Sequence, residues 1–486
     1  MFTGISAKNG LIIFAIRLFL TFTPNFKTMK KIIAGCILLS FIITSCNQPK
    51  NEVVVDDNTI VDGHPAWILQ GNIYEVNTRQ YTPEGTFKAF EKHLDRLKEM
   101  GVQTLWFMPI NPISKVDRKR DTTELGSYYA VADYKAINPE YGNMEDWKSL
   151  VKHAHEMGFK VIIDWVPTHS GADHYWLKTN PDFYIKDSVT GKPISQYDWT
   201  DTRKLNYKNP QMVDSMIACM KFWITESNID GFRCDVAGEV PDAFWSKAIP
   251  ELKKMKNILM LAEGDKPSLH KDGFDMSYAW EDFATMVKIA KGKRTATSLD
   301  SVIAKNDSAM MQNKIRMYFT SNHDENSWNQ ADFGTMPGDI HAPFAVLTQT
   351  IKNTVPLIYG GQEEPFLDSL KFFVKDTIIF GKYQRAEFYK KLLALRKSNP
   401  ALAPNASYTK LASNNDAAIF AYVRQQGKNK VLVVLNLSNT AQTASTNNEI
   451  INGQATNLFT GKTEKIVAGE KINLAPWGYA VYDYKQ

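Results

Sequence analysis

The stretch FKAFEKHLDRLKEMGVQTLWFM, from Phe87 to Met108, contains one repeating unit of the fold. Its first part, Phe87 to Glu99, carries apolar side chains at positions 87, 90, 94 and 97, which fall on one face of a helix. Gly101 ends this predicted helix, and Thr104 to Met108 is a short apolar run typical of a buried strand. A helix that leads into a buried strand indicates a parallel sheet with crossover helices.

The same alternation continues on both sides of this unit. Further strands are predicted at Ile73 to Val76, Lys160 to Trp165, Gly231 to Asp235, Ile258 to Glu263, Met317 to Ser321 and Pro356 to Tyr359, with a weaker candidate at Phe274 to Ser277. Helical patterns precede several of them. The number of strands favours a closed (β/α)8 barrel, also called a TIM barrel, in the α/β class.

Two stretches interrupt the alternation. Residues 170–210 are rich in aromatic residues, Asp and Gly and are too long for an ordinary loop, so they predict a small lobe inserted after the third strand. Beyond residue 400, short apolar runs separated by polar turns predict a C-terminal all-β sandwich. The expected organisation is a leader and signal peptide over residues 1–45, a tether over 46–66, the barrel with its lobe over 67–400 and the sandwich over 401–486.

The leader resembles a bacterial lipoprotein signal. Met29-Lys30-Lys31 precedes the mainly apolar run Ile32 to Ile43, and Thr44-Ser45 places small residues before Cys46. The run is too short to span a bilayer, which takes about 20 residues. The resemblance implies cleavage before Cys46, a lipid on its thiol and anchoring in the cell envelope, on its periplasmic or surface face. A non-lipidated secretory signal is the alternative.

The charge balance argues against a nucleic-acid partner. The chain has 57 Lys and Arg against 52 Asp and Glu, but residues 1–45 hold five Lys or Arg and no acidic residue. Without the leader the two totals are equal. A neutral chain has no field that would attract phosphates, so nucleic acid is not expected to bind.

Carboxylates and histidines gather at the predicted C-terminal ends of the strands, where barrels of this kind carry their active sites. These side chains are Asp164 with His169, Arg233 with Asp235, Glu263, and His323 with Asp324. Burying so many charges costs several kcal/mol per ion unless the groups are paired or used. Their convergence on one barrel mouth therefore predicts a functional site.

Four short motifs at these positions resemble those of the α-amylase superfamily of glycoside hydrolases, glycoside hydrolase family 13. They are DWVPTH from Asp164, GFRCD from Gly231, LAE from Leu261 and SNHD from Ser321, and they stand in the order of the family. GSYYAVADY from Gly126, IYGGQE from Ile358, the lobe and the sandwich extend the resemblance from Trp67 to the end of the chain. The resemblance implies a retaining hydrolase of α-glucosidic bonds in starch-like α-glucans or malto-oligosaccharides.

The resemblance also implies a role for each carboxylate: Asp235 as nucleophile, Glu263 as general acid and base, and Asp324 as stabiliser of an oxocarbenium-like transition state. Arg233 and Asp235 are two apart on a strand, so their side chains leave the same face, and the guanidinium favours the ionised carboxylate. Glu263 ends an apolar strand, where poor solvation favours the protonated form. A structural Arg233–Asp235 pair and helix-capping roles for Glu263 and Asp324 are the alternatives.

Further residues are predicted to bind the substrate. The resemblance implies that His169 and His323 bond sugar hydroxyls and that Tyr129 is a stacking platform for the same ring, with Arg233 beside it. Each of these side chains could instead be a packed core residue.

The residues that bind structural calcium in many family members differ in this chain. Thr168, Lys204 and Glu239 stand where Asn, Asp and His are common, and a lysine cannot bind the ion. We expect no cofactor and no calcium at the usual site, although Glu239 or aspartates of the lobe could hold an ion elsewhere. Asp235 to Val240, with KLN from Lys204, is closer to the neopullulanase and cyclomaltodextrinase branch.

Two other functions stay open at this point. One is a transglycosylase or disaccharide-specific enzyme of the same superfamily, because the lobe and loops decide which acceptor binds. The other is a non-catalytic glucan-binding lipoprotein. The presence of Asp235, Glu263 and Asp324 together argues against the second alternative, because a scaffold without catalysis would be free to lose one of them.

Overall fold

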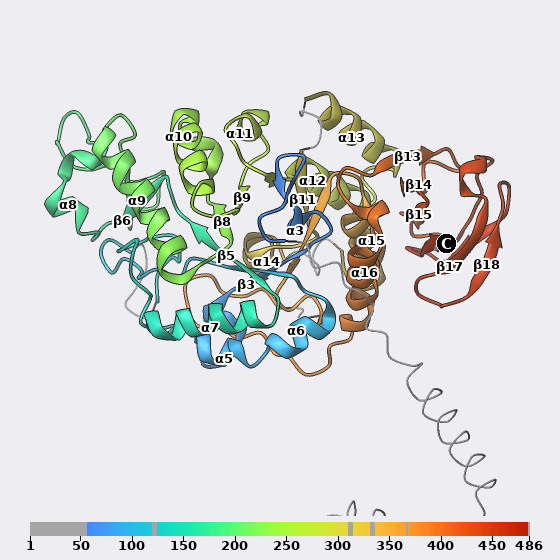
Figure 1. The fold of residues 1–486 in the computed structure, drawn as a ribbon, viewed down its shortest axis with the longest axis horizontal. Helices are drawn as coiled ribbons and strands as arrows, with labels where there is room; N and C mark the ends of the chain where they lie inside the picture. The colour runs from blue at the N-terminus through green and yellow to red at the C-terminus, as the bar shows by residue number, and fades with distance from the viewer. Residues whose placement is uncertain (1–55, 119–123, 310–313, 331–335, 366–367, 485–486) are drawn as a thin grey trace, which may run out of the picture. The chain divides into compact units, whose positions relative to one another are not determined.

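The computed structural model describes residues 56–484, apart from residues 119–123, 310–313, 331–335 and 366–367. Within these ranges the chain folds into a closed eight-stranded barrel followed by an all-β domain (Figure 1). Each adjacent pair of barrel strands is parallel. The prediction of a (β/α)8 barrel with a C-terminal β domain is confirmed.

The barrel strands follow one another around the barrel in chain order, and the last strand pairs with the first. They are β3 (Ile73–Val76), β4 (Thr104–Phe107), β5 (Lys160–Trp165), β8 (Gly231–Cys234), β9 (Leu259–Ala262), β10 (Met276–Tyr278), β11 (Ile315–Tyr318) and β12 (Thr354–Tyr359). Most of their residues are fully buried because helices cover the outside and side chains fill the inside.

Helices connect the strands across the outside of the barrel. They include α5 (Phe87–Glu91), α6 (Leu94–Met100), α7 (Met144–Glu156), α9 (Pro210–Ser227), α10 (Asp242–Lys253), α11 (Pro267–Lys271), α12 (Trp280–Ala290), α13 (Thr297–Ala309), α14 (His323–Asn329), α15 (His341–Thr350) and α16 (Ala386–Ser398). The helix predicted from Phe87 is split into α5 and α6, although its apolar positions stay buried. Gly101 ends α6 with φ at 97°, a conformation that favours glycine.

The predicted lobe lies between β5 and α9. Its strands β6 (His169–Gly171) and β7 (Thr202–Lys204) pair in an antiparallel ladder, and the short helix α8 (Trp176–Thr179) lies between them in the chain. Three buried aromatic residues form the core of the lobe: Trp176, Phe183 and Tyr184, with the rings of Trp176 and Phe183 5.3 Å apart between centroids. The pairing of β6 with β7 fixes His169 at the barrel mouth.

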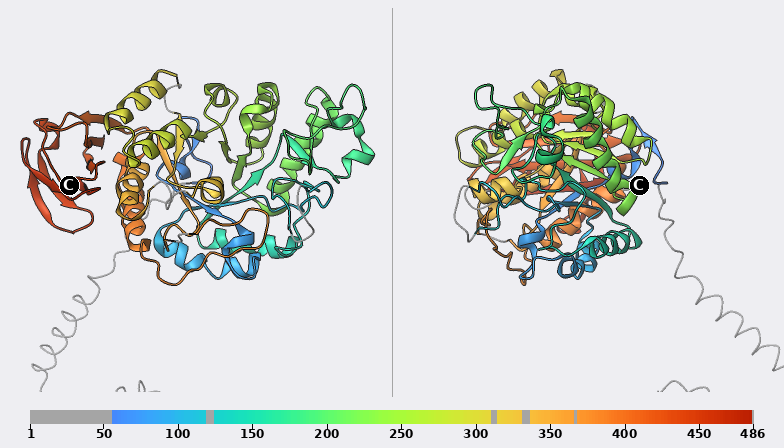
Figure 2. Two further views of the ribbon diagram at one scale, coloured as in Figure 1. Left: turned by 180° about the vertical axis from the view of Figure 1, so that it is seen from behind. Right: turned by 90° about the vertical axis from the view of Figure 1, so that its left-hand side faces the viewer.

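The C-terminal domain is built on a six-stranded sheet in the order β13-β14-β15-β20-β17-β18, with a separate β16–β19 pair. The strands are β13 (Ser407–Leu411), β14 (Ile419–Gln426), β15 (Asn429–Asn436), β16 (Gln442–Ala444), β17 (Gly453–Asn457), β18 (Thr463–Ile466), β19 (Ile472–Leu474) and β20 (Tyr479–Tyr484). Figures 1 and 2 show the sheet beside α15 and α16, and one apolar cluster runs from the barrel into it.

Residues 56–66, at the end of the predicted tether, pack on the barrel. β1 (Ile60–Val61) pairs with β2 (His64–Pro65), and Lys160 Nζ lies 2.5 Å from a carboxylate oxygen of Asp57. Buried His64 contacts Asp275 at 3.1 Å. The predicted tether is therefore shorter at this end. Its first part, the signal peptide and Cys46 lie outside the described residues, and no helix within the described ranges is long and apolar enough to cross a membrane.

Arg424 of β14 joins the sheet to the barrel, and we expect Arg424→Met to be strongly destabilising. Its buried guanidinium donates to the carbonyls of Thr350 (3.0 Å) and Ile351 (2.7 Å), at the C-terminal end of α15, and to that of Ala403 (2.6 Å). A methionine removes the guanidinium from all three carbonyls, and Ala403 alone keeps a backbone donor, the N–H of Ala406, so the free energy of unfolding should fall by about 3 kcal/mol. Urea unfolding measures the change.

The exposed Lys465 of β18 provides the matched control. Lys465→Met should change the free energy of unfolding by less than about 0.5 kcal/mol, because the side chain lies on the surface. Equal unfolding curves for the two variants would contradict the role given to Arg424.

Candidate active site

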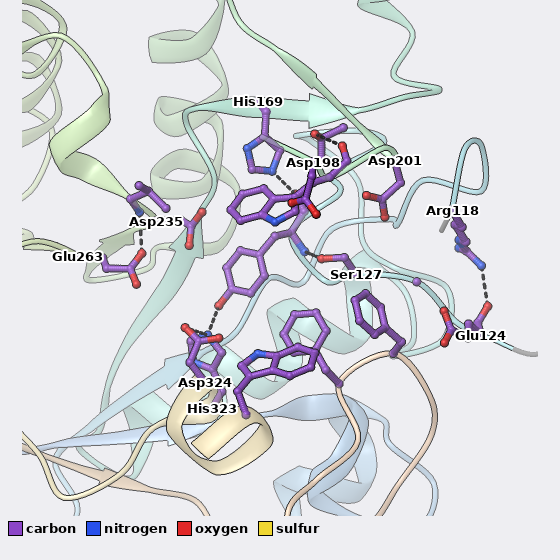
Figure 3. Close-up of a pocket in the computed structure, with 18 residues that line it drawn as sticks. Arg118, Glu124, Ser127, His169, Asp198, Asp201, Asp235, Glu263, His323 and Asp324 are labelled. Atoms are coloured by element: carbon purple, nitrogen blue, oxygen red, sulfur yellow. Dashed lines mark hydrogen bonds and ion pairs between the residues drawn. The ribbon is translucent and has the colours of Figure 1, made fainter. Parts of the chain in front are cut away.

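A cavity of about 530 Å³ opens at the C-terminal ends of the barrel strands (Figure 3). It is lined by Arg118, Glu124, Gly126, Ser127, Tyr129, His169, Asp198, Trp199, Asp201, Thr202, Asp235, Val236, Glu263, His323, Asp324, Trp328, Phe372 and Phe373. Figure 3 shows Asp235 and Glu263 together on one side of the cavity and Arg118 with Glu124 on the other. The structure thus brings together at one cavity all the predicted site residues except Cys46, which lies outside the described residues, and Arg233, which lies buried behind the wall.

Arg233 of β8 links the carboxylates of three neighbouring strand ends. Its Nη1 donates to Asp164 Oδ1 (2.9 Å) and to Asp235 Oδ1 (2.9 Å), and its Nη2 lies 3.1 Å from Glu263 Oε2. The Nε–H donates to the hydroxyl of Tyr278 at 3.1 Å. The guanidinium is buried, so each of its charged contacts is poorly screened by water.

Asp235 follows β8 and is buried beside Arg233. Burial raises the pKa of Asp235, the neighbouring Glu263 carboxylate raises it further, and Arg233 opposes both. The sequence predicted only the effect of Arg233, which lowers the pKa of Asp235, and did not predict the opposing effects of burial and Glu263. The nearby Glu263 carboxylate therefore disfavours the ionised form of Asp235, and the Arg233 guanidinium favours it.

Glu263 follows β9, and its side chain is 15% exposed to the cavity. Its Oε2 accepts a hydrogen bond from the backbone N–H of Val236 at 2.7 Å. Val236 has φ at 42°, which is unfavourable for a β-branched residue and costs about 1 to 3 kcal/mol. This strained backbone points an N–H at Glu263 and so helps to hold its carboxylate in the site.

His323, Tyr129 and Asp324 form a second hydrogen-bonded group. His323 Nε2 lies 2.8 Å from the Tyr129 hydroxyl and 3.4 Å from Asp324 Oδ2. Burial lowers the pKa of His323, but Asp324 and then Glu75 raise it to about 9, so the imidazole is charged at neutral pH. The Tyr129 hydroxyl accepts from His323 and donates to Asp164 Oδ2 at 3.2 Å.

His169 has a different protonation state. Burial lowers the pKa of His169 to about 4, so its ring is neutral at neutral pH. Nε2–H donates to the Tyr129 carbonyl at 3.1 Å, which leaves Nδ1 to accept from the Thr168 hydroxyl at 2.7 Å. Both nitrogens have protein partners, so a sugar hydroxyl would have to replace one of them.

Several residues of the site were not predicted from the sequence. Trp328, Phe372 and Phe373 line the cavity, and Glu75 of β3 lies buried behind it, 2.5 Å from His323. Trp328 stands four residues after Asp324 on α14, so helical spacing could have identified it. The two phenylalanines belong to a segment without regular secondary structure, and no pattern singled them out.

The residues at the usual calcium positions have other partners here. Thr168 bonds His169, Lys204 pairs with His169 across β6 and β7, and Glu239 accepts hydrogen bonds from Gln196 and Tyr197. In the described part of the chain, no three His, Cys, Asp or Glu side chains lie close enough to hold a metal ion.

A parallel barrel with carboxylates facing one cavity at its strand ends is typical of the glycoside hydrolases, and comparison with known proteins gives the family. Residues 56–384 match the α-amylase catalytic domain, and residues 408–481 match the C-terminal domain of maltogenic amylase. The chain belongs to the α-amylase family and is a glycoside hydrolase. This assignment removes the non-catalytic alternative.

Three similar proteins illustrate the relationship. Alpha-amylase 3 of Dictyoglomus thermophilum is 25% identical over 88% of this chain and 96% of its own length. The cyclomaltodextrinase of Thermoanaerobacter pseudethanolicus is 27% identical over 73% of this chain, but the match spans only 64% of that enzyme. The structure of the noncanonic maltogenic α-amylase AmyB from Thermotoga neapolitana has a TM-score of 0.78 and 26% identity, covering 86% of this chain and 99% of AmyB.

Removal of calcium should have little effect on stability. Because Thr168 and Glu239 already bond other protein groups and Lys204 carries a positive charge, we expect EDTA to change the melting temperature by only a few degrees. An ion that binds only the folded protein adds about 3 to 4 kcal/mol when its concentration exceeds the dissociation constant 100- to 1000-fold. A large drop in melting temperature with EDTA that added calcium reverses would contradict the prediction.

Proposed function

We propose that the protein hydrolyses α-glucosidic bonds of starch-like α-glucans and malto-oligosaccharides and retains the configuration at the anomeric carbon. The observation that carries this proposal is the contact of one guanidinium, Arg233, with the carboxylates of Asp235 and Glu263, at 2.9 and 3.1 Å. Retaining enzymes place their two carboxyl groups about 5 to 5.5 Å apart, and inverting enzymes about 6.5 to 9.5 Å. Contact with a single guanidinium supports the shorter separation.

The proposed reaction has two displacements. In the first, the Asp235 carboxylate forms a bond to the anomeric carbon while the glycosidic bond breaks, and Glu263 gives its proton to the departing oxygen. In the second, Glu263 takes a proton from water, and the water oxygen replaces Asp235 on the same carbon. Each displacement inverts the carbon, so the product keeps the α configuration.

Asp324 is proposed to stabilise the positive charge that develops on the sugar in the transition state of each of these steps. Its carboxylate lines the cavity and lies 3.4 Å from the charged ring of His323. A fixed negative group next to the developing oxocarbenium ion acts strongly in a site that is shielded from water.

Aromatic side chains support an extended glucan as substrate. The rings of Tyr129 and Phe372 are nearly parallel, at 12° and 6.3 Å between centroids, and Trp328 lies 5.4 Å beyond Phe372. Trp328 is 54% exposed, so the row leads from the buried centre to the surface. Rings in such a row offer apolar faces to successive sugar units, which suits a chain better than a single sugar.

The same aromatic side chains favour transglycosylation as a second candidate. A second sugar could bind against the aromatic wall of the cavity and take the place of the attacking water. This wall includes Trp199, Trp328, Phe372 and Phe373. Analysis of the products from maltotriose separates the two functions. Hydrolysis gives only glucose and maltose, whereas transglycosylation gives oligosaccharides longer than maltotriose.

We expect Asp235→Asn and Glu263→Gln each to lower the rate on maltodextrin by about 10² to 10⁴ or more, because each removes a group that reacts directly. The fold should survive, with nearly unchanged melting temperatures. Glu251→Gln, which alters only a surface pair with Lys221, is the matched control and should keep its activity. A variant at either position that keeps more than half of the wild-type rate would contradict the role assigned to that residue. Retention is tested separately, by NMR of the anomer that the wild-type enzyme forms first.

We also propose that a lipid on Cys46 anchors the enzyme in the cell envelope, and Cys46→Ser tests this. Each buried CH₂ of an acyl chain adds about 0.8 kcal/mol, so membrane retention should depend on the modified thiol. The variant should release active enzyme into the soluble fraction or leave an unprocessed precursor. A processed variant that stays with the membrane would show that the lipoprotein interpretation is wrong.

A further inference from the structure

Glu75 is a buried carboxylate that the proposed reaction does not use. It belongs to β3, has no exposed surface and accepts a hydrogen bond from His323 Nδ1 at 2.5 Å. Its second oxygen, Oε2, is buried and has no hydrogen-bond donor among the described residues. A buried carboxylate with hydrogen bonds to only one of its oxygens lowers stability, which indicates a role that depends on its charge.

The contacts of His323 suggest that role. With Nδ1–H donating to Glu75, Nε2–H is left to donate to the Tyr129 hydroxyl at 2.8 Å and to face Asp324 at 3.4 Å. Tyr129 then has its own proton free to bond Asp164, which also binds Arg233. One hydrogen-bonded series therefore runs from Glu75 to the guanidinium that holds Asp235 and Glu263.

We propose that Glu75 is a positioning residue that fixes the ring of His323 as a double donor and, through it, places Tyr129 and Asp324 for the reaction. This inference rests on the proposed function, because it gives Asp324 its task. Without Glu75, a neutral His323 could present an acceptor nitrogen to Tyr129. The Tyr129 proton would then turn from Asp164 to His323, and Asp324 would lose its cationic neighbour.

The charged and titratable groups around this pair are consistent with a charged His323. Asp324 and Glu75 favour its protonated form, while burial and Arg233 oppose it. Asp164, Arg233, Tyr278 and Tyr359 also interact with Glu75. Tyr278 belongs to β10 and Tyr359 to β12, while Tyr129 and Asp164 lie beyond His323. Burial raises the pKa of Glu75, and His323 opposes this shift.

The direct test is an NMR titration of the His323 ring nitrogens in the ¹⁵N-histidine-labelled protein, assigned with His323→Gln. The wild-type ring should carry both protons at pH 7 and lose one near pH 9. In Glu75→Gln the midpoint should fall by at least one pH unit, toward the ordinary value of about 6.5. The charged ring is present below the midpoint. Between about pH 6.5 and 9, the wild-type ring should therefore stay charged while the ring of the variant becomes neutral as the pH rises. A wild-type ring that is neutral at pH 7, or an unchanged midpoint in the variant, would overturn the proposal.

Kinetics test whether Glu75 acts through His323. Glu75→Gln should lower kcat by about 10-fold and leave KM nearly unchanged, because the positioned groups act in the transition state. In the His323→Gln background the same change should have little further effect. An equal loss in both backgrounds would refute the proposal.

Asp282 provides the matched control. It is also a buried carboxylate, held by Arg316 (3.1 Å) and the Tyr318 hydroxyl (2.9 Å) away from the cavity. Asp282→Asn should lower stability but leave the His323 midpoint unchanged. The NMR titration does not require an active enzyme. If the proposed function is wrong, the Asp235→Asn variant keeps its activity. If this inference is wrong, the midpoint of His323 does not move in Glu75→Gln. If Glu75→Gln does not fold, the wild-type titration alone still decides the charge of His323.

Discussion

The buried guanidinium of Arg233 is the interaction on which the rest of the site depends. It contacts Asp164, Asp235 and Glu263 from β5, β8 and β9, and the Tyr278 hydroxyl from β10. Four consecutive strands of the barrel thus meet at one side chain. The planar fork of an arginine can make several directed bonds at once, whereas a lysine is a single compact charge on a flexible stem. The relative placement of the two proposed catalytic carboxylates follows from this geometry.

Most of the barrel could be predicted from sequence because parallel strands are buried on both faces and appear as short apolar runs. The exceptions have physical reasons. The split between α5 and α6 could not be seen, because positions 87, 90, 94 and 97 keep their helical spacing across the break and all stay buried. β11 begins at Ile315, two residues before the expected start, where Arg316 interrupts the apolar run although it is buried and paired with Asp282.

The candidate site could be predicted where chemistry-bearing residues stand at or near the end of an apolar run, but one carboxylate in the middle of a strand was missed. Asp235 and Glu263 follow apolar runs and were visible for that reason. Glu75 sits inside the strand Ile73–Val76, and its partner His323 is 248 positions further along the chain. Likewise the sequence shows Arg233 two positions from Asp235, but it does not show that Glu263, from the next strand, comes close enough to raise the pKa of Asp235.

The balance of charge in the site indicates what it is built to bind. Two cations, Arg233 and His323, face five carboxylates, those of Glu75, Asp164, Asp235, Glu263 and Asp324. Even with the one proton that the proposed reaction needs on Glu263, the group keeps an excess of negative charge. In the proposed reaction, a neutral sugar gains little from such a field, whereas an oxocarbenium-like transition state gains much, so the field would favour the transition state over the bound substrate. On this proposal, the free energy that keeps these charges together is recovered only when positive charge develops on the sugar.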